Sequence, residues 1–216
     1  MNRLFILLFL NICVLNGWAQ QQSNDLYTIS GNDIQTKGEF IVTQELGGYS
    51  NIKPYTLKGE FTFDNDYHVR FYNYKNWDDE AGDYEVVEIN YAGNQILEFI
   101  NESSWKNTPK KYLEYSVLDN KNALFFSLEN NVKAIILIGH SYACDPPVLT
   151  IIVIKDKKAQ VVFNQPWKIE DFKSYPKGFE LTVIDEVKVV GDDNWNPNRL
   201  KIYTTSDGTM KFEKVN

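Results

Sequence analysis

The chain has 216 residues, with 22 basic and 29 acidic side chains and a net charge of −7. Such an acidic protein lacks the basic surface that the phosphates of nucleic acid require, so we exclude nucleic acid as a partner. The length fits one domain of ordinary size, which is large enough to bury a core of its own.

The N-terminus has the pattern of an export signal peptide. Asn2-Arg3 precedes an apolar run over residues 4–15, and small residues follow at Gly17 and Ala19. We expect cleavage near Ala19, which removes residues 1–19 as the signal peptide and leaves a periplasmic or extracellular protein. The apolar run is too short for a membrane span, and no later stretch predicts one.

The two cysteines belong to different parts of the chain. Cys13 lies within the signal peptide, after Asn11-Ile12, where the lipobox of bacterial lipoproteins has small residues. This departure favours plain cleavage, and lipidation of Cys13 stays open as the alternative. The mature chain then keeps only Cys144, which predicts no intramolecular disulfide, and we interpret this thiol as a small apolar side chain.

The rest of the chain predicts an all-β protein. After a flexible lead-in over residues 20–26, we expect a single antiparallel domain over 27–216, built from many short strands separated by Gly, Asn and Asp. The predicted strands are Tyr27–Ser30, Gly38–Leu46, Tyr55–Phe63, His68–Tyr74, Tyr84–Tyr91, Gln95–Ile100, Tyr112–Leu118, Ala123–Leu128, Val132–Ile138, Val148–Ile154, Ala159–Asn164, Phe179–Ile184, Glu186–Val190, Leu200–Thr205 and Thr209–Lys214. The separators at 92–94, 119–122, 156–158 and 206–208 predict hairpin turns.

The most apolar strands follow one another between Ala134 and Asn164. In Ala134–Ile138 and Leu149–Ile154 the apolar residues stand at consecutive positions, so we expect both faces of these strands to be covered. No long stretch has the apolar period of an α-helix. The best helical candidate, Trp167–Ser174, predicts one or two turns at most.

The segment Gly139-His140-Ser141-Tyr142-Ala143 is similar to the nucleophile elbow of the α/β-hydrolases. That elbow requires a helix directly after the serine, whereas Pro146-Pro147 and a β-branched run follow here. In that family the histidine base also follows the serine in the chain, and neither histidine of this chain does so. We therefore interpret the segment as a loop between two core strands.

Two internal similarities indicate repeated units, although an all-β chain rich in Phe, Asn and Trp can also show them by coincidence. When the chain is compared with itself at a shift of 51 positions (200 − 149), a predicted strand, turn and returning strand align with a later strand, turn and returning strand. It pairs Leu149 with Leu200, Ile151 with Ile202, Asp156 with Asp207 and Val161 with Phe212. A shift of 28 positions (99 − 71) pairs Phe71 with Phe99, Asn73 with Asn101 and Trp77 with Trp105.

The region from Glu186 to Val215 combines an apolar strand, an Asn-rich loop, the strand Leu200-Lys201-Ile202-Tyr203, an Asp-Gly turn and a Met-x-Phe strand. This order resembles a blade of FG-GAP or VCBS-type β-propellers, including the small secreted propeller-like proteins of bacteria. The resemblance extends loosely to residues 134–164. It implies a propeller-like arrangement of the strands, with a β-sandwich or a barrel as the alternative.

Those propellers often hold calcium in a loop of the form D-x-[DN]-x-[DN]-G-x-x-D-L. Asp192, Asn194 and Asn196 stand at its first three ligand positions, so the resemblance implies Ca²⁺ there and no other cofactor. The chain departs from the motif, because Pro197 replaces the glycine and no acid follows before Leu200. The alternative is an Asn-rich loop that hydrogen-bonds its own backbone.

Aromatic side chains in or beside the predicted loops are the candidates for ligand binding, since glycan faces and protein hot spots use exposed aromatic rings. The candidates are Tyr74, Trp77, Trp105 and Trp167. We expect a non-enzymatic binding or inhibitor-like protein whose partner is a protein or a glycan. Two alternatives stay open: a carbohydrate-active or other hydrolytic enzyme, which needs a pair of carboxylates, and a surface-assembly component.

Overall fold

The computed structural model describes residues 55–74, 83–115, 122–139, 147–185 and 197–215. This part is all-β and antiparallel, as expected, and it contains two single turns of 3₁₀-helix. The strands are β1 (Tyr55–Phe63), β2 (Tyr67–Tyr74), β3 (Tyr84–Tyr91), β4 (Asn94–Lys106), β5 (Leu124–Ser127), β6 (Lys133–Gly139), β7 (Leu149–Lys155), β8 (Lys158–Gln165), β9 (Lys168–Tyr175), β10 (Gly178–Ile184), β11 (Arg199–Thr204) and β12 (Met210–Val215). Within these ranges, no helix has the length and apolar character needed to cross a membrane.

The strands form three consecutive antiparallel meanders, β1–β4, β5–β8 and β9–β12. The first two are joined into one eight-stranded sheet, and the third is a separate four-stranded sheet. The junction between the first two meanders is narrow. It consists of the residue pairs Trp105–Gly139 and Lys106–Ile138, which connect the end of β4 to the end of β6.

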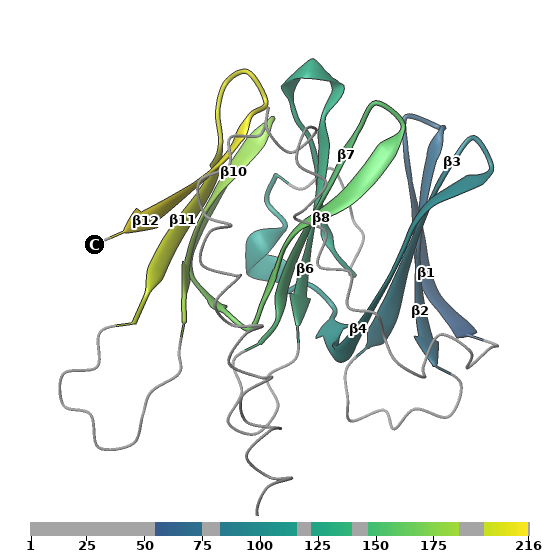
Figure 1. Ribbon diagram of the computed structural model, residues 1–216, viewed down its shortest axis with the longest axis horizontal. Coiled ribbons are helices and arrows are strands. Elements are labelled where there is room, and N and C mark those ends of the chain that lie inside the picture. Colours follow the sequence, from purple (N-terminus) through teal and green to yellow (C-terminus); the bar gives the residue numbers. More distant parts are fainter. Residues whose placement is uncertain (1–54, 75–82, 116–121, 140–146, 186–196, 216) are drawn as a thin grey trace, which may run out of the picture.

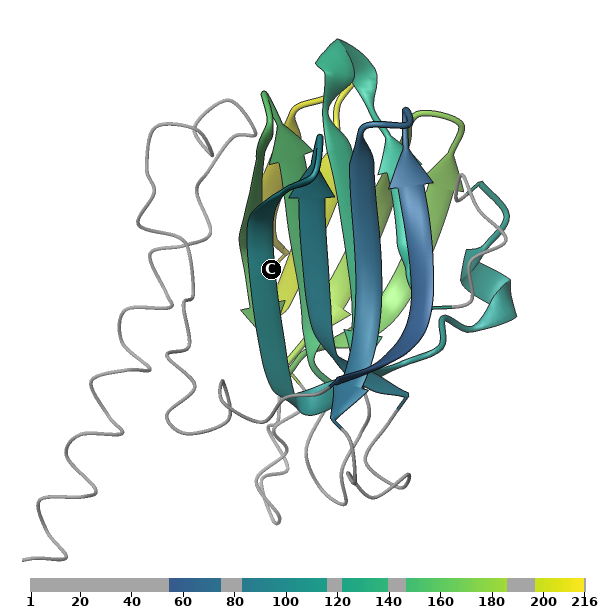
Figure 2. The same ribbon diagram turned by 90° about the vertical axis from the view of Figure 1, so that its right-hand side faces the viewer.

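The three meanders are stacked face to face, so we call them the first, second and third layers (Figures 1 and 2). One apolar core lies between the first and second layers and includes Phe71, Trp105 and Ile135. The other lies between the second and third layers and includes Ile136 and Leu181. The second layer is therefore buried on both faces, which confirms the prediction made from its consecutive apolar residues.

Hairpin turns of all three layers contact one another at one end of the stack. Lys133, whose side chain is only 3% exposed, forms an ion pair with Asp64 of the first layer, with 2.6 Å between Nζ and Oδ2. On the other side of the second layer, Glu129 and Lys177 form an ion pair of 2.6 Å. The Asn130 amide donates a hydrogen bond of 2.6 Å to the carbonyl oxygen of Asp207.

The segment that we predicted as the best helical candidate is strand β9, so that prediction is wrong. The physical reason is a β-bulge: Asp171 lies opposite Thr182 but Ile169 lies opposite Val183, which leaves Glu170 as an extra residue. Ile169 and Phe172 therefore pack on the same core although they are three positions apart. In the sequence this spacing is that of a helix.

The prediction of a strand over Tyr112–Leu118 is also wrong for residues 112–115, which are the part that the structure describes. Tyr112 ends a 3₁₀ turn that begins at Lys110, and the Leu113 N–H donates to the Lys110 carbonyl oxygen. Tyr112 and Leu113 are neighbours in the sequence and both pack against the core between the second and third layers. A regular strand would direct them to opposite faces.

The remaining strand predictions agree with the structure to within a few residues, apart from β4, which extends six residues (106 − 100) beyond the predicted end at Ile100, and except where they fall on undescribed chain. Tyr27–Ser30, Gly38–Leu46 and Glu186–Val190 lie outside the described residues. The similarity at a shift of 51 positions (200 − 149) relates β7–β8 to β11–β12, which are the third and fourth strands of consecutive layers. The other similarity relates β2 to β4 within the first layer.

Candidate functional site

Trp105, one of the predicted ligand-binding residues, is a core side chain. It is fully buried between the first and second layers, where its ring packs against those of Tyr84 and Phe99. Its indole N–H donates a 2.9 Å hydrogen bond to Thr150 Oγ1. Thr150 in turn donates to Asn164 Oδ1 at 2.7 Å. The Trp105 ring therefore offers no face to a ligand from solution.

Trp167, the other candidate whose side chain the structure describes, does not join Trp105 in a common site. Trp167 is half-buried where β8 leads into β9, and its ring packs edge-on against Phe163 in the core between the second and third layers. Tyr74 ends β2 opposite Tyr55 at the edge strand of the first layer. Trp77 lies outside the described residues, in the chain between β2 and β3.

The predicted calcium ligands Asp192, Asn194 and Asn196 also lie outside the described residues, between β10 and β11. So do Ser141 and its neighbours in the hydrolase-like segment. In the part of the chain that the structure describes, no group of three or more His, Cys, Asp or Glu side chains is placed to hold a metal ion.

The clearest arrangement of polar groups lies on the outer face of the third layer, turned away from the core. Along β10 and β11 the side chains alternate, so that Leu181 and Ile202 face the core while Glu180 and Lys201 face outward. Register places the outward residues of four neighbouring strands side by side. We call this surface the β9–β12 outer face; it includes Lys168, Glu170, Asp171, Lys173, Glu180, Arg199, Lys201, Tyr203, Lys211 and Glu213.

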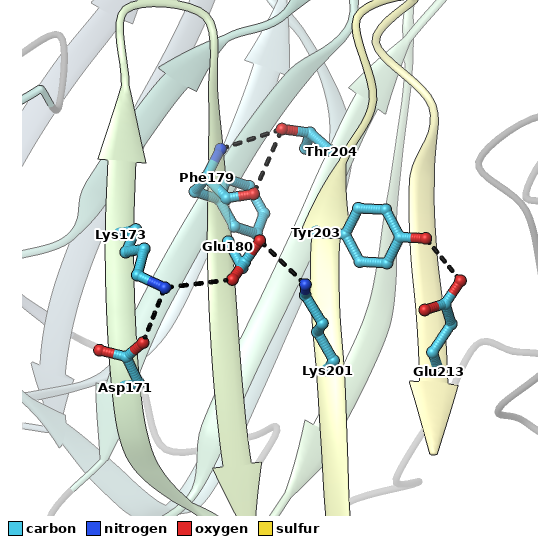
Figure 3. A network of polar contacts seen from close by, with 8 residues as sticks. All are labelled: Asp171, Lys173, Phe179, Glu180, Lys201, Tyr203, Thr204 and Glu213. Atoms are coloured by element: carbon cyan, nitrogen blue, oxygen red, sulfur yellow. Dashed lines mark hydrogen bonds and ion pairs between the residues drawn. The ribbon is translucent and has the colours of Figure 1, made fainter. Parts of the chain in front are cut away.

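A ladder of opposite charges crosses this face from β9 to β11 (Figure 3). Lys173 Nζ lies 3.3 Å from an Asp171 carboxylate oxygen and 3.5 Å from Glu180 Oε1. The second oxygen of Glu180 lies 3.1 Å from Lys201 Nζ. Glu180 thus bridges two cations, and each side chain of the ladder is held by its neighbours.

Tyr203 continues the ladder towards the edge strand β12. Its hydroxyl donates a 2.5 Å hydrogen bond to Glu213 Oε1, and Lys201 Nζ lies 5.2 Å from the centre of its ring. The hydrogen bond to Glu213 is the main cause that raises the pKa of Tyr203. The hydrogen bond to Asp171 likewise raises the pKa of Lys173. At neutral pH the tyrosine is therefore neutral and the lysine charged.

The margins of the face carry a bidentate ion pair and exposed apolar side chains. Arg199 donates from Nε and Nη2 to the two carboxylate oxygens of Glu170, at 3.1 and 3.3 Å. Tyr175 at the end of β9 is 45% exposed, and Val215 at the end of β12 is 40% exposed.

Chemically, this arrangement suits recognition better than catalysis. Each carboxylate named here has a cation or a hydroxyl donor within contact distance. The general acid of a hydrolase typically lies instead in an apolar pocket, away from such partners. A flat row of fixed donors and acceptors can instead be matched by a complementary surface.

These residues were not among the candidates from the sequence. The alternation of Leu200-Lys201-Ile202-Tyr203 indicates a strand with one wet face, which is the signal that was available. It does not say which charges become neighbours. Lys173 and Lys201 meet across Glu180 only because β9 and β11 flank β10.

Comparisons of the chain with models of protein families, with curated proteins and with solved structures found no match.

Proposed function

We propose that the mature chain is an exported, non-enzymatic binding protein, and that the β9–β12 outer face receives a protein partner. The observation that carries the proposal is the ladder through Lys173, Glu180 and Lys201, whose charged ends are fixed by one another yet remain accessible. The Lys173 side chain is 56% exposed and that of Lys201 is 36% exposed. Export rests on the N-terminal signal pattern.

Preorganisation is what makes this face suitable for binding. Long charged side chains lose rotamer entropy when a partner immobilises them, and that loss weakens association. Here Glu180 and Glu213 already restrain the side chains of Lys201 and Tyr203. A partner therefore meets groups that are ordered before contact.

The alternating signs favour a protein partner over a neutral glycan. The face presents five cations, Lys168, Lys173, Arg199, Lys201 and Lys211, among four carboxylates, Glu170, Asp171, Glu180 and Glu213. A protein surface with the complementary order of charges gains both orientation and a faster encounter. Tyr175 and Val215 add apolar contact area at the margins.

The test compares charge reversals on two faces of the protein. Immobilised mature wild type, Lys201→Glu and Lys58→Glu are used as baits with an extract of the source cell envelope, at low salt and at about 0.5 M salt. Lys58 is an exposed residue of β1, so it gives a matched charge change on another layer. We expect one defined protein to be retained by wild type and Lys58→Glu, and lost with Lys201→Glu or in high salt.

Equal capture by Lys201→Glu and wild type contradicts the proposal. A glycan array run on the same three proteins identifies the alternative partner. If a glycan binds equally well to wild type and Lys201→Glu, and also in high salt, then the ligand-binding site lies outside the β9–β12 outer face.

We also infer that the three layers are blade-like repeats of the kind that the resemblance to β-propellers implies. Each layer is a four-stranded meander, and four-stranded sheets are the unit of propeller blades. The sequence similarity between β7–β8 and β11–β12 supports equivalent roles in consecutive units.

A further inference from the structure

Most strands at the edges of the described sheets contain a β-bulge. The extra residue is Lys58 in β1, Ile96 in β4, Val162 in β8 and Glu170 in β9. Strand β4 counts as an edge because only its last two residues pair with β6. A fifth edge strand, β5, has only four residues. Bulges and short length both hinder pairing with another chain, because they interrupt the row of backbone N–H and C=O groups that a partner strand would bind.

Strand β12 is the exception among these edges. It is the last strand of the third layer, and no described strand lies beyond it (Figure 1). All six of its residues pair with β11, from Thr204–Met210 to Arg199–Val215, without a shift in register. The free edge of β12 therefore offers a regular row of backbone donors and acceptors to a further strand.

The side chains of β12 give this edge charges of both signs. Lys211 and Glu213 lie on the β9–β12 outer face, whereas Phe212 between them packs in the core between the second and third layers. Glu213 is exposed, and its carboxylate is positioned by the hydrogen bond from Tyr203. Lys211 is half-buried and forms no ion pair with any residue that the structure describes. An acidic group on a neighbouring strand could pair with it.

A second copy of β12 provides such a group when the two strands pair antiparallel about a two-fold axis. The outer faces of both copies lie on the same side of the joined sheet only when the axis passes through a residue position. Centred on Lys211 or on Glu213, the pairing places like charges opposite each other. Centred on Phe212, it places Lys211 of each copy opposite Glu213 of the other, and opposite charges at such positions stabilise strand pairing.

We propose that the protein forms a two-fold dimer in which the β12 strands of two copies pair antiparallel, with Phe212 opposite Phe212. The dimer joins the two four-stranded third layers into one sheet, and the β9–β12 outer face continues across the axis. A strand of six residues is about 20 Å long, so the interface is small and we expect the dimer to dissociate on dilution. The proposal does not depend on the partner proposed for the outer face.

The first test measures the association of the full mature chain by sedimentation equilibrium over a wide range of concentrations. We expect the wild type to change from monomer to dimer as its concentration rises. Lys211→Glu and Glu213→Lys each turn two attractive pairs into two repulsive ones, so each variant should dimerise about tenfold more weakly. Lys58→Glu makes the same charge change on the bulged edge strand β1 and should dimerise like the wild type.

Mixing the two variants tests the register. Lys211→Glu carries acidic groups at both positions 211 and 213, and Glu213→Lys carries basic groups at both. In a mixed dimer centred on Phe212 every acidic group faces a basic one, so we expect an equimolar mixture to recover the dimer. This recovery also shows that both variants are folded.

Three results would overturn the proposal: a wild type that stays monomeric, single variants that dimerise as strongly as the wild type, or a mixture that stays monomeric. Wild-type assemblies larger than a dimer would also contradict it, because a two-fold pairing of β12 is closed and leaves no second β12 edge for growth.

Discussion

Single residues at the hairpin end connect layers that are distant in the sequence. Lys133 is the clearest case, because its side chain is almost fully buried while its partner Asp64 is 60% exposed. Its Nζ also donates to Asn131 Oδ1 at 2.9 Å and lies 5.4 Å from the centre of the Tyr67 ring. The cation thus has partners on both the first and the second layer.

This arrangement predicts unequal effects of removing the two partners. Asp64→Asn leaves a buried cation with a weaker acceptor and should lower the free energy of unfolding by about 1–2 kcal/mol, a figure that allows for the exposure of Asp64. Asn retains the tolerance for a positive φ that position 64 requires. Lys133→Met should cost less, and the double variant should recover part of the Asp64→Asn loss. Urea titrations of the three variants measure this, and additive losses would contradict it.

Asp207 organises the turn between β11 and β12. Its carboxylate accepts hydrogen bonds from the Thr205 hydroxyl and from the Thr209 N–H, which together lower its pKa to about 2. The next residue, Gly208, has φ +79, and a Cβ there would clash with the Glu129 carbonyl of the second layer. The turn is thus fixed both by its own hydrogen bonds and by a close contact between layers.

The lowered pKa of Asp207 predicts a pH-dependent contribution to stability. A carboxyl with a lower pKa in the folded state stabilises the fold above its unfolded value of 3.8, and the contribution disappears as pH falls through about 2. Asp207→Asn should therefore lower the melting temperature at pH 7 but not near pH 2. Glu213→Gln on the neighbouring strand serves as the control. If the melting temperature of Asp207→Asn stays below that of the wild type at pH 2, the loss of stability has a cause other than the ionisation of Asp207.

At the scale of elements, β9 shows how one extra residue sets the faces of a strand. Glu170 bulges out between the pairs Asp171–Thr182 and Ile169–Val183, which allows Ile169 and Phe172 to share the core side. Its carboxylate pairs with Arg199 at the surface. We therefore expect the stability of the fold to depend more on the extra backbone position that Glu170 provides than on the charge of its side chain.

Deleting Glu170 and truncating it should accordingly give very different results. Glu170→Ala removes a partly exposed ion pair, so the loss should stay below about 1 kcal/mol. Deletion turns the residues before it to the opposite face and removes Ile169 from the core, which should cost about 2 kcal/mol or more. Thermal and urea unfolding of both variants distinguishes them. Similar stabilities would show that β9 shifts its register without loss.

At the scale of the whole molecule, the second layer is the structural centre because each of its faces forms half of a core. Ile135 and Ile136 are neighbours on β6 and both are fully buried, one in each core. Neither outer layer has an apolar core without the second. The described strands should therefore unfold together.

Substitutions on the two sides of β6 test this cooperativity. Ile135→Ala and Ile136→Ala should each lower the free energy of unfolding by about 2–4 kcal/mol, because each leaves a cavity in a closely packed interface. Unfolding should remain a single transition in both variants, by far-UV circular dichroism and by Trp fluorescence. Separate transitions in either variant would indicate that one outer layer unfolds alone.

Much of the strand content followed from local pattern. The bounds of β1 and β3 were predicted to the residue, because both strands are rich in β-branched and aromatic residues and clear turn residues follow them. Strand β4 was predicted only as far as Ile100, since Asn101-Glu102-Ser103-Ser104 has the composition of a turn. The strand continues to Lys106 past Ser104, which has φ +52, and so carries Trp105 into the core instead of into a loop.

Local sequence pattern was enough to predict the all-β class, most strands and the burial of the second layer on both faces, since these depend on the polarity of neighbouring residues. The stacking of three meanders, the burial of Trp105 and the charge ladder through Glu180 became evident from the folded arrangement of the strands. Those features depend on which strands become neighbours in space. Residues such as Trp105 and Thr150 are far apart in the chain, and no local pattern encodes their contact.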